Sequence, residues 1–378
     1  GAKYVSEGLK ESKTLTSLDL SHNRICKDGN MEGLNALCEM LKVNTTLQSI
    51  NLAGNDIVFR GDMAGVKALC AMLKVNTTLQ SINLENTALN SEAAKHISQG
   101  LKENNTLTSL NLADNRICQN GEMAGLNGLC EMLKVNTTLQ SINVDGHPLP
   151  IKQLKGDVPT ESIDLSNKRL NVASAVIIAS LIGSNSVTKS LSLAGNFICY
   201  DGEMAGLSAL CQMLEVNTTL KSINVSWNEF RAEGAKVFAE MLKINTTLQS
   251  VDISNNYFRA EGAKVFAEML KINTSLQSVN IDGDPLPIKQ LKGDAPAESI
   301  NLSDKDLHVA SAIVIASLIG SNSVTKSLNL DSNAIGEQYD GETRTFVYTP
   351  EGTTAIAKML EVNNTITSIS INNNTLCG

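Results

Sequence analysis

Aromatic side chains are scarce in this chain of 378 residues: Phe, Tyr and Trp together make up 3% of it, and there is one Trp. Hydrophobic residues nevertheless reach 42%, so the core must be built from Leu, Ile, Val, Ala and Met. The sequence also lacks apolar runs of the roughly 18 residues that a bilayer-spanning helix needs. The composition therefore indicates a folded domain with an aliphatic core and no membrane helix.

Basic residues are outnumbered, with 31 Lys and Arg against 39 Asp and Glu, which gives a formal net charge of −8. A nucleic-acid backbone and an anionic membrane surface are both negatively charged and would be repelled by such a chain. We therefore expect neither of them as the main partner. A protein partner, and a basic one in particular, fits this charge better.

Signatures of enzymes and metal sites are absent as well. The sequence contains no Gly-rich phosphate loop, nucleophile elbow or zinc signature. No C-x-x-C pair occurs among the eight cysteines, and the four histidines are scattered along the chain. We therefore predict that the chain is not an enzyme and that it holds no cofactor and no metal ion.

What the sequence does contain is a repeat. Thirteen segments fit L-x-x-L-x-L-x-x-N-x-L or a close variant, such as LTSLDLSHNRI (15–25) and LKSINVSWNEF (220–230), most of them 28 or 32 residues apart. The L-x-L core alternates with period two, which predicts a short strand with one buried face. The stretch that follows, as in 231–247, places Ala235, Phe238, Ala239 and Leu242 on one helical stripe. Such strand–helix units bury their apolar faces only by stacking on one another.

The fold class that follows is an α/β leucine-rich repeat solenoid, or horseshoe, of about thirteen repeats, with parallel strands on the concave face and helices on the convex face. The 28-residue unit with its full helix, as in LKENNTLTSLNLADNRI (101–117), resembles the ribonuclease-inhibitor class of leucine-rich repeats. Nucleotide-binding-domain leucine-rich-repeat receptors and the Ran GTPase-activating protein carry the same class. The L-P-I-K-Q-L-K-G segment is similar to repeats in algal and other protist proteins.

A second level of repetition divides the chain. Residues 281–330 nearly copy residues 144–193, and each copy contains a 21-residue unit with two prolines. Because proline disfavours helix interiors, we expect no α-helix and a local kink at 147–160 and 284–297. We expect one leucine-rich repeat domain over 1–378 with both ends cut within a repeat, so that the chain is a fragment of a longer protein.

Repeated polar residues have structural roles in this scheme. The Asn of the motif, at eight of the thirteen positions, is expected to satisfy backbone groups where each strand ends. The N-T-T turns create N-x-S/T sequons that would be glycan sites only in a secreted protein. The cysteines that share one register, Cys38, Cys70, Cys130 and Cys211, are expected to face the core and stay reduced. This favours the cytoplasm, with secretion left open.

The strand-facing positions hold an excess of carboxylates, which could steer a basic protein or merely keep the chain soluble. These acidic positions are Asp19, Glu85, Asp114, Asp145, Glu161, Asp164, Asp252, Asp282, Glu298, Asp304 and Asp331, against Lys189, Lys221 and Lys326.

Exposed aromatic residues give the sharper binding prediction, because Trp and Tyr dominate interface energies. We predict a partner-binding patch of Phe197, Trp227, Glu229 and Tyr257, flanked by Lys221 and Asp252. The alternative is that these rings pack against their own loops. A hairpin is predicted within the insertion 336–352, where Tyr339 and Tyr348 are further candidate contacts. Its alternative role is to cover the last repeat.

The function predicted is a non-catalytic scaffold or ligand-sensing repeat domain that binds a protein through its concave face and rim loops. The chain is expected to be monomeric or part of a longer protein. A GTPase activator of the Ran-activator type, with Arg24 or Arg116 as the contributing residue, is one alternative. A structural subunit of a larger assembly is the other.

Overall fold

The computed structural model describes residues 1–340 and 345–376. Two compact units can be distinguished by their internal contacts. Unit one comprises residues 1–159 and 169–185, and unit two comprises residues 160–168 and 186–378.

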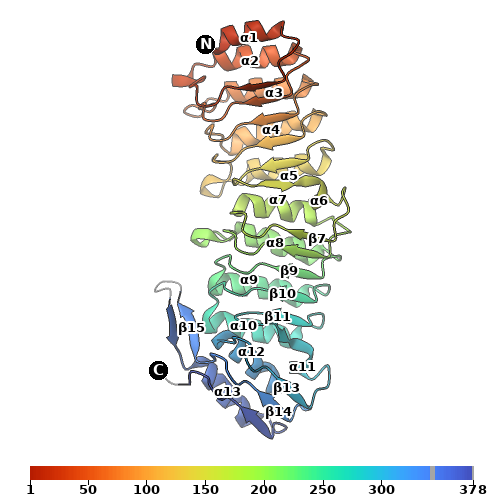
Figure 1. Cartoon of the computed structure of the whole chain (residues 1–378), viewed down its shortest axis with the longest axis vertical. Helices are drawn as coiled ribbons and strands as arrows, with labels where there is room; N and C mark the ends of the chain where they lie inside the picture. Colours follow the sequence, from red (N-terminus) through yellow and green to blue (C-terminus); the bar gives the residue numbers. More distant parts are fainter. Residues whose placement is uncertain (341–344, 377–378) are drawn as a thin grey trace. The chain divides into compact units, whose positions relative to one another are not determined.

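Unit one alternates short strands with helices (Figure 1). Its elements are α1 (Ala2–Lys10), β1 (Ser17–Asp19), η1 (Lys27–Gly29), α2 (Glu32–Val43), β2 (Ser49–Asn51), α3 (Ala64–Val75), β3 (Ser81–Asn83), α4 (Ser91–Glu103), β4 (Ser109–Asn111), η2 (Gln119–Gly121), α5 (Ala124–Val135), β5 (Ser141–Asn143), β6 (Pro148–Pro150), α6 (Ile151–Lys155) and α7 (Val172–Ile182).

Unit two continues the alternation and adds a hairpin. Its elements are β7 (Ser162–Asp164), β8 (Ser190–Ser192), η3 (Tyr200–Gly202), α8 (Ala205–Val216), β9 (Ser222–Asn224), α9 (Arg231–Ile244), β10 (Ser250–Asp252), α10 (Arg259–Ile272), β11 (Ser278–Asn280), β12 (Leu286–Pro287), α11 (Ile288–Lys292), β13 (Ser299–Asn301), α12 (Val309–Ile319), β14 (Ser327–Asn329), β15 (Glu337–Asp340), β16 (Thr345–Tyr348), α13 (Glu351–Val362) and β17 (Ser368–Ser370).

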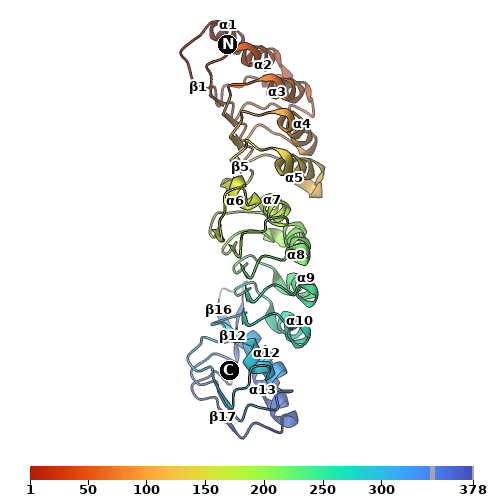
Figure 2. The same cartoon turned by 90° about the vertical axis from the view of Figure 1, so that its right-hand side faces the viewer.

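The sequence repeat and the strand register coincide. In unit one Leu18 pairs with Ile50, which pairs with Ile82, and the parallel sheet continues through β5. In unit two the same position runs from β7 to β11, and a separate sheet joins β13, β14 and β17. In each unit the helices cover one side of the strands (Figure 2). The described residues thus form thirteen parallel strands at the thirteen predicted segments.

The core is aliphatic, as predicted, with a few phenylalanines concentrated in one region. The predicted stripe of α9 is buried, including Phe238 and Leu242. Phe238 stacks on Phe266 of α10 with ring centroids 6.3 Å apart, and Phe266 stacks on Phe258 at 5.6 Å. These rings give the loop between β10 and α10 a rigid, tightly packed base.

The motif asparagines form the expected structural ladder. Asn55 Oδ1 accepts hydrogen bonds from the backbone of Asn23 and Ile25, and its Nδ2 donates to the carbonyls of Leu20 and Leu52. One amide therefore satisfies the strand ends of two neighbouring repeats.

A second asparagine ladder lies at the N-T-T turns. Asn245 Nδ2 donates to the carbonyl of Leu214 at 2.6 Å, while its Oδ1 accepts from the backbone of Leu248. The same position is buried at Asn44, Asn76, Asn136, Asn217, Asn245 and Asn273. Because Nδ2 is the atom that a glycan would occupy, these sequons are blocked in the folded chain.

The expectation of no α-helix in the two proline blocks is wrong. Short helices, α6 and α11, begin directly after Pro150 and Pro287, which occupy their N-cap positions. Proline is tolerated there because its missing N–H would have had no intrahelical partner. The segment before each helix forms a strand, β6 or β12, that pairs antiparallel with β5 or β11, an addition to the expected all-parallel sheet. Each sheet ends at this strand, because proline cannot donate to a further ladder.

The predicted hairpin is present. Strands β15 and β16 pair antiparallel, from Glu337 opposite Tyr348 to Asp340 opposite Thr345. The turn was expected at Asp340 and Gly341; Asp340 is the last residue of β15, and Gly341 lies outside the described residues. Figure 1 shows the hairpin beside the ends of α10 and α12. Among the described residues, none of the helices combines the length and apolar character needed to cross a bilayer.

Candidate partner-binding site

A cavity of about 400 Å³ lies in unit two, where the strands lead into the helices. Its walls come from the loops that follow β9, β10, β11 and β13, and from both strands of the hairpin. We call it the aromatic cavity. It is lined by Trp227, Asn255, Asn256, Tyr257, Phe258, Arg259, Ile281, Asp282, Asp306, His308, Ala310, Gln338, Tyr339 and Phe346.

Ring contacts join the hairpin to the loops. The Tyr257 and Tyr339 rings stack with centroids 6.0 Å apart, and Tyr339 meets Phe346 edge to face at 5.4 Å. Phe346 stacks on His308 at 4.8 Å. The hairpin therefore rests on the loops before α10 and α12. The hairpin thus brings together two candidate binding regions that were predicted separately from the sequence, the Trp227–Tyr257 region and the insertion.

Trp227 occupies an unfavourable backbone conformation. Its φ is +56°, the left-handed region that bulky side chains rarely adopt, and its side chain is 55% exposed. Other repeats place residues suited to this conformation at the same register, among them Gly54, Asn86, Gly195 and Asn255. The neighbouring Asn228 is fully buried, and it fixes the backbone beside Trp227 in this strained conformation. A large ring is thus exposed at a register where other repeats carry Gly, Asn or Asp.

Charged groups of both signs surround the cavity. The Arg259 guanidinium lies 3.7 Å from an Asp340 carboxylate oxygen, so its charge is partly compensated. His308 Nε2 lies 3.4 Å from Asp306 Oδ1, and the carboxyl of Asp306 is well exposed. Nδ1 of His308 is buried without a hydrogen-bond partner among the described residues.

Asp282 closes the floor of the cavity and caps α12. Its carboxylate accepts hydrogen bonds from the backbone N–H groups of Ala310 and Ser311 and from the Ser311 hydroxyl. The buried surroundings raise the pKa of Asp282, against the opposing effect of these hydrogen bonds. Asp145 caps α7 in the same way, through the N–H groups of Asn171 and Ser174, and burial raises its pKa too. Both residues had been predicted on the open strand face, and that placement is wrong because the helix ends bind them.

A comparison with protein-family models agrees with this architecture. A family model described as Leucine Rich repeat matches residues 11–29, 43–57, 103–120, 216–239 and 245–267. The chain is built of leucine-rich repeats. Its fold is an α/β leucine-rich repeat solenoid.

Several solved structures are similar to parts or most of the chain. Leiomodin-1 actin-binding site 2 is 22% identical and covers 34% of this chain and 75% of that one, with a TM-score of 0.32. The tropomodulin C-terminal domain from Caenorhabditis elegans is 12% identical, covers 38% and 82%, and scores 0.33. An internalin from Listeria monocytogenes is 17% identical, covers 98% and 83%, and scores 0.29. The comparison with curated proteins finds no match.

The other sequence-predicted residues lie elsewhere on the leucine-rich repeats. Phe197 pairs edge to face with the exposed Tyr200, at 5.9 Å, and is not among the residues that line the aromatic cavity. Asp252 accepts hydrogen bonds from the backbone and hydroxyl of Ser254, which engages one of its oxygens. Glu229 and Lys221 are half-buried.

Tyr348 lies near the end of the chain. Its hydroxyl donates to the carbonyl of Leu376 at 3.0 Å, which ties the hairpin to the last described residues. Part of the insertion therefore contacts the end of the final leucine-rich repeat, and its role as a cover for that repeat stays a prediction.

His308, Phe346, Arg259 and Asp306 were missed by sequence reasoning. A signal for two of them exists in the duplicated blocks. The segment N-K-R-L-N (167–171) of the first copy becomes D-K-D-L-H (304–308) in the second. Two exchanges in this short loop create Asp306 and His308, at the site where the hairpin docks.

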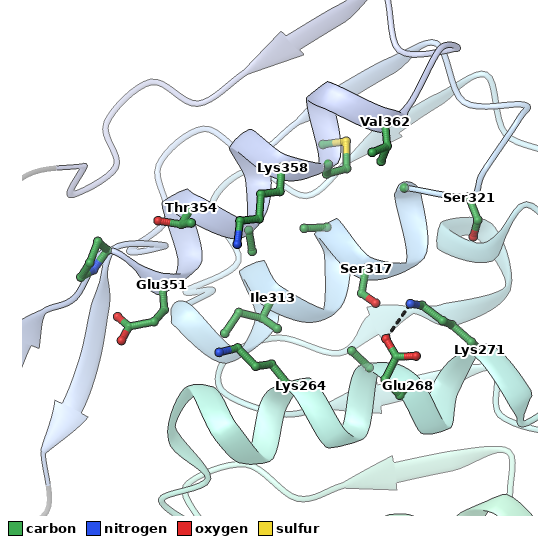
Figure 3. A pocket seen from close by; sticks show the side chains of 16 residues that line it. Lys264, Glu268, Lys271, Ile313, Ser317, Ser321, Glu351, Thr354, Lys358 and Val362 are labelled. Atoms are coloured by element: carbon green, nitrogen blue, oxygen red, sulfur yellow. Dashed lines mark hydrogen bonds and ion pairs between the residues drawn. The ribbon is translucent and has the colours of Figure 1, made fainter.

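A second hollow lies on the helix side of unit two. This helix groove, of about 860 Å³, runs between α10, α12 and α13 (Figure 3). Ala316 of α12 and Gly320 at its C-cap are small and leave the space, and Glu268 and Lys271 form a 2.6 Å ion pair on the wall of the groove. Its described lining residues include no aromatic side chain. We therefore place the candidate site at the aromatic cavity.

Several buried cysteines are kept in the unreactive thiol form by their surroundings. Burial raises the pKa of Cys38, Cys199 and Cys211 to about 12, which keeps them protonated. The buried cysteines Cys26, Cys38, Cys70, Cys130, Cys199 and Cys211 are free thiols. Across residues 1–340 and 345–376, no three His, Cys, Asp or Glu side chains are grouped so that they could hold a metal ion.

Proposed function

We propose that this chain is a non-catalytic scaffold or sensing domain that binds a protein partner at the aromatic cavity and along the adjoining strand face. The observation that carries the proposal is Trp227, a large ring kept exposed in a strained backbone conformation beside Tyr257 and Tyr339. Stored strain at an exposed aromatic residue is typical of functional positions. Trp and Tyr are also the residues that most often dominate protein interfaces.

The rest of the site supports a protein partner. The cavity is continuous with loops from four successive leucine-rich repeats, so a partner can contact several of them at once. Carboxylates at or just after the strands recur along the leucine-rich repeats, at Asp19, Glu85 and Asp331 among others, as suits a broad surface. Some of this charge is compensated, because Lys189 pairs with Glu161 and Lys326 pairs with Glu298. A moderately acidic, wide surface with an aromatic anchor favours a basic protein partner.

We further propose that the repeats are of the ribonuclease-inhibitor class, since the longer units carry full helices of 12 to 14 residues. The buried, free cysteines support a reducing compartment such as the cytoplasm.

Affinity capture with matched variants tests the proposed function. The chain is used as bait in a native extract of its source organism, beside Trp227→Asn with Tyr257→Asp. These two changes copy residues found at the same registers, Asn255 and Asp56. Tyr4→Ser, at an exposed ring in unit one, is the control.

We expect a protein that is retained by the unchanged chain and by the control but is reduced at least tenfold by the double variant. Equal retention by all three would refute binding at this site. Addition of a purified Ran-like GTPase to the same preparation distinguishes the GTPase-activator alternative, because a scaffold leaves the rate of GTP hydrolysis unchanged.

A further inference from the structure

We propose that the aromatic cavity binds the cationic head of a lysine or arginine side chain from the partner protein. The inference rests on the proposed function and names the chemistry that the site would recognise. Its grounds are the ring faces, the charges and the volume of the cavity.

The ring faces come first. Trp227, Tyr257, Tyr339 and Phe346 all line a space of about 400 Å³. Ring faces carry negative electrostatic potential and attract ammonium and guanidinium groups that lie within about 6 Å. The same rings bind the aliphatic part of a long basic side chain. A space of this volume accommodates one such side chain but not a folded element.

The charges favour a cation over an anion. The positive end of α12 is already satisfied by Asp282, which accepts hydrogen bonds from Ala310 and Ser311. The N–H groups that would otherwise attract a phosphate or carboxylate are therefore occupied. Among the described residues that line the cavity, Arg259 contributes the one guanidinium, and it is paired with Asp340. Asp306 adds an exposed carboxylate on the same wall.

A group at the floor of the cavity would gain from a bound cation. Burial of the Asp282 carboxyl raises its pKa. A nearby positive charge would favour its ionised form. His308 stacks on Phe346, and its Nε2 lies 3.4 Å from Asp306 Oδ1, so the imidazole ring is fixed beside the exposed carboxylate of Asp306. The first copy of the duplicated block has Asn171 and Arg169 at the positions of His308 and Asp306, so this environment is specific to the second copy.

Tryptophan fluorescence provides a direct test, because Trp227 is the only tryptophan in the chain and lines the cavity. Blocked tripeptides Gly-X-Gly are titrated into the full chain, with X as arginine, lysine, citrulline or norleucine. Citrulline has the shape of arginine without its charge, and norleucine has the aliphatic stem of lysine. We expect saturable changes for arginine and lysine with half-saturation in the millimolar range, and at least fivefold weaker responses for the neutral peptides.

Variants of opposite sign separate electrostatics from structure. Asp306→Asn removes a carboxylate and is expected to weaken arginine-peptide binding about threefold to tenfold. Arg259→Gln removes the competing cation and is expected to strengthen it about twofold to fivefold. Phe197→Leu, at a ring outside the cavity, is the control and should change nothing. Circular dichroism of each variant verifies the fold.

Each outcome decides the question. Equal responses to arginine and citrulline, or none to any peptide up to about 100 mM, would overturn the cation site. Weakening by both Asp306→Asn and Arg259→Gln would show that these residues act only through the fold and would equally overturn it. Loss of the cation response with intact partner capture would leave the proposed scaffold function standing. A cation response without any captured partner would support the cation site and would count against the proposed scaffold function.

Discussion

At the scale of single residues, Trp227 shows how a repeat protein displays a functional side chain. Each leucine-rich repeat turns sharply after its strand, and the residue before the ladder Asn adopts positive φ. Gly, Asn and Asp fit this conformation, whereas an aromatic residue costs roughly 1–2 kcal/mol. Where most repeats carry a turn-forming residue, a repeat with a bulky residue at the same register, such as Trp227, is therefore a candidate for a functional position.

Replacement of Trp227 by Asn should stabilise the chain, because the strain is relieved and little buried contact is lost. We expect the free energy of unfolding to rise by up to about 1 kcal/mol in urea titrations followed by circular dichroism. The reciprocal change, Asn86→Trp at the same register of unit one, should cost about as much. If Trp227→Asn instead destabilised the chain by more than about 1 kcal/mol, the ring would have to pack against its own loop.

Asn228, the ladder asparagine next to Trp227, stabilises the fold, whereas Trp227 strains the backbone. Asn228 is fully buried, and its Nδ2 donates to the carbonyls of Leu193 and Ser226, both at 2.9 Å. Asn228→Ala leaves several buried backbone groups unsatisfied and should cost at least about 2 kcal/mol. Asn228→Thr should cost less, because Thr87 stands at this register and its hydroxyl donates to the carbonyl of Leu84. Equal losses in thermal unfolding of both variants would contradict this account.

At the scale of elements, the caps of α7 and α12 could not be read from the sequence. Asp145 and Asp282 lie 26 or more residues before the N–H groups they accept from, so local patterns place them on a strand face. The prediction of no α-helix in the two proline blocks was wrong for a related reason. Proline was read as a helix breaker, but its effect depends on the position at which it stands, and at an N-cap it starts a helix.

The cap of α12 predicts an unusual pH dependence. Because the pKa of Asp282 is raised above 3.8 in the folded chain, the folded state binds more protons than the unfolded state just above pH 3.8. The contribution of Asp282 to stability therefore falls as pH rises through that window and stays low above the folded pKa. Asp282→Asn removes the titrating carboxyl and with it this loss of stability at higher pH. The amide oxygen of the variant can still accept a hydrogen bond from the backbone at the start of α12. The stability of the variant relative to the unchanged chain should rise from pH 4 to pH 7 in urea titrations.

A control of opposite sign is Asp331→Asn. The hydrogen bond from the Ser370 hydroxyl lowers the pKa of Asp331, so its contribution is present above 3.8 and is lost as pH falls. Its variant should lose stability relative to the unchanged chain toward neutral pH. A parallel trend in both variants would show that the general charge balance, rather than Asp282, produces the effect.

The hairpin adds a prediction about how elements hold one another. Tyr339 and Phe346 contact Tyr257 and His308 through their rings, and such pairs contribute about 0.5–1.5 kcal/mol each. The double change Tyr339→Ala, Phe346→Ala should release the hairpin and make segment 337–348 sensitive to limited proteolysis. The leucine-rich repeats should keep their helical circular dichroism signal. Cleavage at an unchanged rate would show that other contacts fix the hairpin.

At the scale of the whole molecule, the repeats were predictable and the site was not. The middle apolar residue of each segment, such as Ile223, pairs with that of the next because each repeat contacts its neighbours in a fixed register. The site depends instead on a hairpin that returns over loops formed some 80 residues earlier, as Tyr339 does on Tyr257. Periodicity contains no information about such a contact. Trp227, Tyr257 and Tyr339 were identified from the sequence, but their meeting was not, and Phe346 and His308 were missed.

The whole-chain pattern of cysteine burial makes a final prediction. Burial raises the pKa of Cys26 and Cys130 to about 11 and that of Cys38, Cys199 and Cys211 to about 12. At pH 8 the thiolate fraction of each is therefore at most about one in a thousand, and attack by a thiol reagent requires opening of the repeat. In the native chain these five should resist labelling by a disulfide-forming reagent for hours, as mapped by peptide mass spectrometry. In 8 M urea all should react within minutes, and prior reduction should not change the number. Rapid native labelling at Cys38 or Cys211 would mean that the helices open far more often than their burial predicts.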